Sequence, residues 1–230
     1  MSSAAASPSR FRPVLFATFA TMVAGFVDAV GYAHLGGLFL SFMSGNSTRL
    51  GIQIAGGEWH LVLLTAGVIA GFVLGAVVGT LVADAAGEWK LVAVLGTEVA
   101  LFAFAVGLTG ADAGRLSLLP VAVAMGMQNS VHQIIAGADI GKSFVTGALF
   151  SCGQALARSL GGRARPSEVL AYAGSWASFV AGACIGALLL TAAGLIPAMA
   201  GACLLLAGLT ATAFLFHGHL GPAIARQGGD

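Results

Sequence analysis

Apolar residues fill almost the whole chain in eight segments, each about long enough to cross a bilayer as a helix. A crossing needs about 20 predominantly apolar residues. The chain is 58% hydrophobic and 8% charged, whereas soluble domains carry roughly 25% charged residues. The expected segments are 13–34, 38–56, 60–85, 90–109, 117–136, 140–160, 168–193 and 197–216. The pattern predicts an all-α integral membrane protein, a single transmembrane domain over residues 1–230.

Charge and motif content argue against several classes of function. The net charge is +1 and basic residues do not cluster, which argues against a nucleic-acid partner. The sequence holds no HExxH, no GxSxG and no adjacent Ser–His pair, so we expect no enzyme. The cysteines Cys152, Cys184 and Cys203 lack metal-ligand spacing and are interpreted as small buried apolar residues. No metal and no cofactor is expected.

Two stretches of the chain are similar to each other. Residues 66–87 and 173–194 are identical at 12 of 22 ungapped positions, at an offset of 107, where about four matches are expected by chance. A second match, with one inserted residue, pairs GFVDAVGYAHLGGLFLSFMSGN with GMQNSVHQIIAGADIGKSFVTGA. It aligns Gly25 with Gly126, Asp28 with Asn129, Phe42 with Phe144, Ser44 with Thr146 and Gly45 with Gly147. We therefore expect two homologous four-segment halves, 11–110 and 115–217.

Small residues form a stripe in the third segment of each half. The stripes are Gly67, Gly71, Gly75 and Gly79 in one half, and Gly174, Ser178, Gly182 and Gly186 in the other. Small residues four apart let helix backbones approach closely in lipid. We expect the two stripes to pack against each other and join the halves. The alternative interpretation is a homodimer in which one stripe faces a second copy.

Polar residues interrupt the second segment at SGNSTR, residues 44–49, and a matching break follows in the sixth segment. An unsatisfied polar group in hydrocarbon costs several kcal/mol, so these side chains must face protein, water or a ligand. Paired breaks predict that the second segment of each half is broken or re-entrant and borders a mid-membrane binding site. The alternative is hydrogen bonding between helices without a ligand. The candidate substrate-binding residues are Ser44, Gly45, Asn46, Thr48, Gln128, Asn129, Thr146 and Gly147.

Three charged residues fall within or beside the apolar segments. Asp28 lies in the first segment and Glu98 near the middle of the fourth, where a charge is expensive. Either carboxyl group could carry a coupling proton or cation. Arg49 could contact an anionic solute or neutralise Glu98 or Asp28, and a purely structural ion pair is an equal alternative.

The positive residues predict orientation but not the topology of the repeat. With eight full crossings, seven basic residues lie inside and two outside; with re-entrant second and sixth segments, eight lie inside and one outside. Both arrangements place the N- and C-termini in the cytoplasm, and parallel and inverted repeats both remain open.

The stretch GFVDAVGYAHLGGLFLSFMSGNSTRLG, with the later GMQNSV and FVTGAL, resembles the YoaK-like family of bacterial polytopic membrane proteins, a domain of unknown function numbered 1275. Ser44 departs from the threonine expected there but keeps the hydroxyl group. The resemblance covers nearly the whole chain and implies a multi-pass protein of the bacterial inner membrane, without a settled substrate.

The paired breaks favour a secondary transporter that binds a small solute between the halves, with proton or cation coupling through Asp28 or Glu98. A channel for a small solute or ion is the alternative, although the sequence offers no charged ring or filter-like repeat. A membrane scaffold is a third interpretation and would leave the paired breaks without a purpose.

Overall fold

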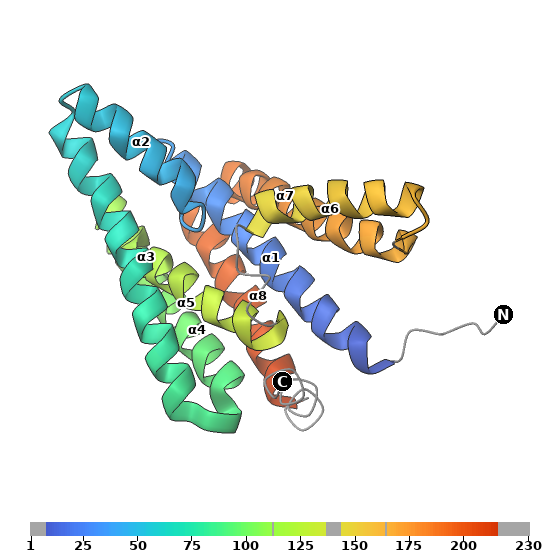
Figure 1. The fold of residues 1–230 in the computed structure, drawn as a ribbon. Helices are drawn as coiled ribbons and strands as arrows, with labels where there is room; N and C mark the ends of the chain where they lie inside the picture. Colours follow the sequence, from blue (N-terminus) through green and yellow to red (C-terminus); the bar gives the residue numbers. More distant parts are fainter. Residues whose placement is uncertain (1–7, 112, 137–143, 164, 216–230) are drawn as a thin grey trace.

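A computed structural model describes residues 8–111, 113–136, 144–163 and 165–215 of the chain. Helices make up almost all of this part, and no strand occurs in these ranges (Figure 1). The elements are α1 (Pro8–His34), α2 (Met43–Ala55), α3 (Trp59–Ala86), η1 (Gly87–Trp89), α4 (Lys90–Gly110), η2 (Gly114–Leu118), α5 (Leu119–Ala136), α6 (Phe144–Leu160), α7 (Pro166–Ala193) and α8 (Leu195–Leu215). The predicted all-α architecture is confirmed.

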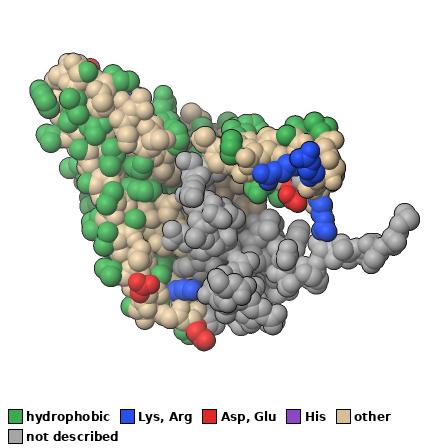
Figure 2. All heavy atoms as spheres, viewed as in Figure 1, with side chains coloured by type: hydrophobic (Ala, Val, Ile, Leu, Met, Phe, Trp, Pro, Cys, Tyr) green, Lys and Arg blue, Asp and Glu red, His purple; other side chains and the backbone are tan. Residues whose placement is uncertain are grey.

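Large apolar side chains cover the outside of the molecule, where a soluble protein would be polar (Figure 2). Leu63 is 75% exposed, Leu81 62% and Leu204 73%. Three stretches of the described chain are long and apolar enough to span a membrane: Trp59–Gly110, Pro166–Ala193 and Leu195–Leu215. The prediction of a membrane protein is therefore supported by the surface as well as by composition.

Turn residues and helix starts explain most of the boundaries. Gly57, at φ 70°, closes the tight α2–α3 turn, a backbone region that glycine enters without strain. Pro166 occupies the first turn of α7, where its missing N–H group has no intrahelical partner to lose. Gly194, at φ 88°, ends α7 immediately before α8.

Helix α2 is shorter than the segment expected over 38–56. It has 13 residues, about 20 Å at 1.5 Å per residue, which is less than the roughly 30 Å hydrocarbon core. The expected helix start at residue 38 is wrong, because residues 35–42 form a loop in which Gly36 and Gly37 adopt positive φ.

The loop 35–42 turns the chain back along α1. Ser41 donates to Asp28. Arg49, eight residues after Ser41, donates to the carbonyl of Gly36, which is eight residues after Asp28. Helices α1 and α2 therefore run in the same direction (Figure 1). The buried side chains of Gln53 and Thr65 hydrogen-bond across the next turn, so α3 runs back against α2.

The glycine stripe of α3 contacts α5 and that of α7 contacts α1, so the expected packing of stripe against stripe is wrong. A Cβ atom on Gly75 would overlap the backbone of Val123 in α5, and one on Gly79 would meet Met127. From the first contact to the second, the residue numbers rise by four on both helices, so α3 and α5 run in the same direction. The partners of the stripes are therefore α5 and α1.

The corresponding contacts join α7 to α1. A Cβ atom on Gly182 would overlap the backbone of Met22, and one on Gly186 would meet that of Phe26. Gly67 and Gly174, at the outer end of each stripe, have open space beside them. A homodimer through these glycines stays a prediction. Within one chain, the inner glycines already contact α5 or α1.

Candidate functional site

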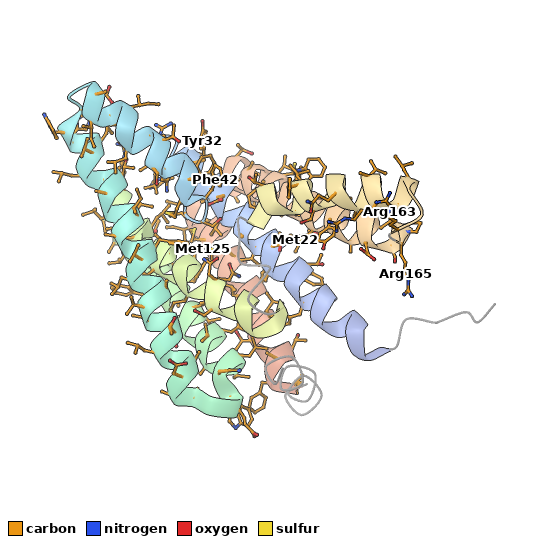
Figure 3. The ribbon with its side chains drawn as sticks, viewed as in Figure 1. Met22, Tyr32, Phe42, Met125, Arg163 and Arg165 are labelled. Atoms are coloured by element: carbon orange, nitrogen blue, oxygen red, sulfur yellow. The ribbon has the colours of Figure 1, made fainter. Side chains whose placement is uncertain are left out.

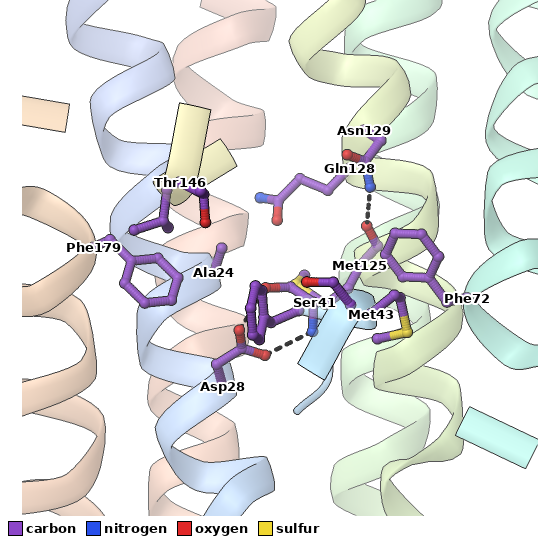
Figure 4. A pocket seen from close by; sticks show the side chains of 13 residues that line it. Ala24, Asp28, Ser41, Met43, Phe72, Met125, Gln128, Asn129, Thr146 and Phe179 are labelled. Carbon is purple, nitrogen blue, oxygen red and sulfur yellow. Dashed lines mark hydrogen bonds between the residues drawn. The ribbon is translucent and has the colours of Figure 1, made fainter. Parts of the chain in front are cut away.

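A cavity of about 280 Å³ lies where α1, α2, α5 and α6 meet, with α3 and α7 at its sides. Small-molecule sites commonly enclose about 300–1,000 Å³, so this one suits a small ligand. Its lining combines a few polar groups with apolar walls (Figure 4). The lining residues are Ala24, Asp28, Ser41, Phe42, Met43, Ser44, Phe72, Met125, Gln128, Asn129, Val145, Thr146 and Phe179.

Asp28 fixes the loop 35–42 to α1 at the edge of this cavity. Its Oδ1 atom accepts the N–H groups of Leu40 at 2.7 Å and Ser41 at 2.6 Å, and Oδ2 accepts the Ser41 hydroxyl at 2.7 Å. The side chain is 2% exposed. Hydrogen bonds to a charged acceptor are stronger than neutral ones, so this carboxylate holds the start of α2 in place.

Asn46 fixes the other side of the same loop. Its Oδ1 accepts the N–H group of Phe39 at 3.0 Å, and its Nδ2 donates to the carbonyl of Phe39 at 2.7 Å. Asn46 is fully buried. Because both polar atoms of the amide are occupied by the loop backbone, this residue shapes the cavity wall and does not line the cavity.

Helices α5 and α6 contribute amides and a hydroxyl group. Gln128 extends from α5 into the space between the walls, with its amide toward Thr146 (Figure 4). Asn129 donates from Nδ2 to the carbonyl of Met125 at 3.1 Å. Thr146 lies in the first turn of α6, and Ser44 lies in the first turn of α2. Neither of these two hydroxyl groups has a hydrogen-bond partner in the described ranges.

Aromatic and thioether groups form the apolar walls. Phe72 from α3 and Phe179 from α7 lie on opposite sides of the cavity, with Met43 and Met125 between them (Figure 4). Phe42 also lines the cavity. Figure 3 labels Phe42, at the end of the loop before α2, and Met125 of α5 in the same central region. The arrangement suits a ligand with an apolar body and one or two polar groups.

The structure brings together five of the predicted site residues: Asp28, Ser44, Gln128, Asn129 and Thr146 line the cavity. It places Gly45, Asn46, Thr48 and Gly147 outside the lining. The Thr48 hydroxyl donates to the carbonyl of Ser44 in its own helix. A Cβ atom on Gly45 would meet the rings of Phe42 and Phe39, so this glycine permits close packing.

Arg49 and Glu98 also lie outside the cavity lining. The Nη2 atom of Arg49 donates to Gly36 at 2.8 Å, and within the described ranges Arg49 forms no ion pair with Asp28 or Glu98. Glu98 is fully buried in α4, which packs against α5 and α8. Neither of its carboxyl oxygens has a hydrogen-bond partner among the described residues.

Sequence reasoning missed Ser41 and the aromatic walls. Phe72 and Phe179 occupy matching positions of the 66–87 and 173–194 repeat, so their pairing was visible, but nothing in the sequence showed that their rings face a cavity. Among the residues that the structure describes, no group of three His, Cys, Asp or Glu side chains is placed to hold a metal ion.

The family of the chain follows from comparison with known proteins. The sequence model of the family described as "Protein of unknown function (DUF1275)" matches residues 16–213, and the chain belongs to this family. It is 33% identical over 174 residues to the UPF0700 transmembrane protein RA0705 of Rhizobium meliloti (strain 1021), covering 76% of this chain and 74% of that protein. The UPF0700 transmembrane protein YoaK of Bacillus subtilis (strain 168) is 27% identical over 137 residues, covering 56% of this chain and 61% of that protein. No solved structure matches. The predicted resemblance to the YoaK-like family is confirmed.

Proposed function

We propose that this chain is a secondary transporter that binds a small solute in the cavity between two homologous halves. One observation carries the proposal: residues that match in the repeat line the same cavity from both halves. The matched lining pairs are Ala24 with Met125, Asp28 with Asn129, Met43 with Val145, Ser44 with Thr146, and Phe72 with Phe179. Solute sites at the interface between repeats are typical of transporter folds.

The packing between halves supports the repeat. Gly75 against Val123 matches Gly182 against Met22, and each pair links a third helix to the first helix of the other half. Gly25 approaches the backbone of Phe179 as Gly126 approaches that of Phe72. Two halves that repeat their contacts as well as their residues are expected to be related by a pseudo-two-fold axis.

Helix directions favour an inverted repeat. Helix α3 runs against α2 and therefore against α1, while α5 runs with α3. The first helices of the two halves thus run in opposite directions. Helix α2 then returns to the side on which α1 ends, which makes it re-entrant in the proposed membrane orientation.

Positive charge supports the proposed orientation. Arg163 and Arg165 lie at the α6–α7 turn, where Figures 2 and 3 show a basic patch. In an inverted arrangement this turn, the start of α4 with Lys90 and both termini share one side. The positive-inside rule makes that side cytoplasmic. We propose the bacterial inner membrane as the location.

Movement of one half against the other would open the cavity to each side in turn. The glycine contacts place backbone against backbone, where few side chains obstruct sliding. A buried carboxyl group without partners is a candidate proton carrier, so Glu98 is the candidate coupling residue. A channel through the same residues is the second candidate function, favoured by the hydroxyl groups of Ser44 and Thr146, which have no hydrogen-bond partner among the described residues.

Ligand-dependent thermal stability tests the binding site. The detergent-solubilised protein is heated with single members of a panel of amino acids, amines, organic acids, sugars and nucleobases. A ligand that binds only the folded state raises the melting temperature in proportion to occupancy. We expect at least one class to stabilise the native protein, and the double variant Ser44→Ala, Thr146→Ala to lose that stabilisation because both cavity hydroxyl groups are removed.

Thr48→Ala is the matched control, because its hydroxyl group lies on α2 outside the cavity and bonds its own helix. It should keep the full ligand response. A response that survives in the double variant would remove the binding site from this cavity.

A further inference from the structure

We propose that the solute is a small organic cation, an ammonium group with apolar substituents that pairs with Asp28. The inference rests on the proposed function and adds the chemical class of the solute. It depends on three features of the cavity: its charge, its aromatic walls and the state of the α2 N-terminus.

The first feature is an unbalanced negative charge. Among the described residues that line the cavity, Asp28 is the one charged side chain. Its hydrogen-bond donors, the backbone of Leu40 and Ser41 and the Ser41 hydroxyl, are all neutral. These hydrogen bonds come from neutral groups, so they stabilise the carboxylate without balancing its negative charge. Buried charges are normally paired, so a cationic ligand would complete this site.

The second feature is the aromatic lining. Phe42, Phe72 and Phe179 all border the cavity, and two of them come from opposite sides of it (Figure 4). The face of an aromatic ring is electron-rich and attracts ammonium groups, most strongly where water is excluded. Met43 and Met125 add polarizable thioether groups that suit methyl or methylene substituents. A site that bound only a proton would not need these aromatic and thioether side chains.

The third feature is that the charged side chain beside the α2 N-terminus is negative, although no side chain caps the helix itself. Helix N-termini attract anions, and α2 begins at the cavity. Asp28 takes the N–H groups of Leu40 and Ser41 immediately before that helix. Arg49, the nearest basic residue along α2, is directed to Gly36 outside the lining. No lysine or arginine lines the cavity, so the described residues favour a cation over an anion.

Isothermal titration with an isosteric pair tests the charge of the solute. Choline and 3,3-dimethyl-1-butanol have the same shape and differ in the positive charge. We expect the native protein to bind choline at least about tenfold more tightly than the neutral alcohol, because only choline pairs with the carboxylate. Asp28→Asn should remove this difference between the two probes. An amide is a fair replacement because Asn129 occupies the matched position of the second half.

Phe179→Leu is the second variant and preserves an apolar side chain at the wall. It should weaken choline binding by about two- to fivefold while changing binding of the neutral alcohol less, since the cation–aromatic attraction alone is lost. If Asp28→Asn does not fold, the native comparison and Phe179→Leu decide the question. Thr48→Ala serves as the control with native affinities for both probes.

Equal affinity of the native protein for the two probes would overturn the cation assignment, as would retention of choline preference in folded Asp28→Asn. If acetate or another anion binds at Ser44 and Thr146 while choline does not, the cation assignment fails and the proposed transporter site stands. If no compound of any class binds, both proposals fail.

Discussion

Alanine at Gly75 or Gly182 is expected to lower the melting temperature of the purified protein by about 6–12 °C. A Cβ atom at either position would overlap backbone atoms, of Val123 and Met22 respectively, and a backbone cannot rotate away as a side chain can. Overpacking of this kind typically costs about 1–3 kcal/mol, and a value near 3 corresponds to that shift for a chain of this size. The helices would have to separate at the joint between halves.

Gly67→Ala and Gly174→Ala are the matched controls, one on each stripe. Both positions have open space for a Cβ atom, and alanine has the better helix propensity by about 1 kcal/mol, so stability should be unchanged or slightly higher. Differential scanning fluorimetry of the four variants checks the difference. If all four melt together with the native protein, the helix contacts described for the stripes are incorrect.

Glu98→Leu is expected to stabilise the protein by about 1–3 kcal/mol. Burying a polar group without a hydrogen bond costs that much, and neither carboxyl oxygen of Glu98 has a partner among the described residues. Leucine fills a similar volume between α4, α5 and α8 without that cost. Chemical denaturation of the two proteins in the same detergent measures the gain.

Glu98→Gln distinguishes the cost of an unsatisfied buried polar group from an effect of side-chain packing. Its amide has the same unmet hydrogen bonds, so it should not bring the gain seen with leucine. Glu88→Leu, at an exposed position before α4, should change stability by less than about 0.5 kcal/mol. Destabilisation by Glu98→Leu would mean that the carboxyl group makes bonds essential to the fold, and its candidacy as a proton carrier would weaken. A stabilising Glu98→Leu would instead indicate that the carboxyl group is kept at a cost to the fold, as expected of a functional group.

Most of the fold could be predicted from the apolar segments and from the similarity between two stretches of the sequence. The eight expected segments correspond to α1–α8, because twenty apolar residues in a row between polar turns leave few alternatives to a helix. The paired breaks led to Ser44 and Thr146, which both line the cavity. Asp28, Gln128 and Asn129 were found because polar side chains are costly inside an apolar helix.

The sequence did not reveal which groups each polar residue contacts. Asn46 was expected to bind solute, yet both of its amide atoms bond Phe39, and this depends on a loop whose path has no local signature. The glycine stripes predicted close helix contacts, but spacing alone does not identify the partner helix. Phe72 and Phe179 were inconspicuous among 14 phenylalanines, since an aromatic side chain suits lipid and cavity equally.

Thiol labelling at Thr146 tests most directly whether the cavity is a solute site reached alternately from both sides of the membrane. Thr146→Cys is placed in a chain whose Cys152, Cys184 and Cys203 are replaced by alanine, and is reconstituted into vesicles. Val73→Cys, 56% exposed on the apolar outer surface, is the control and should not react. We expect a membrane-impermeant thiol reagent to modify Thr146→Cys from either side, without the reagent crossing to thiols on the other side. Modification from neither side, or from one side alone, would contradict alternating access at this cavity, and passage of the reagent through the protein would indicate a channel.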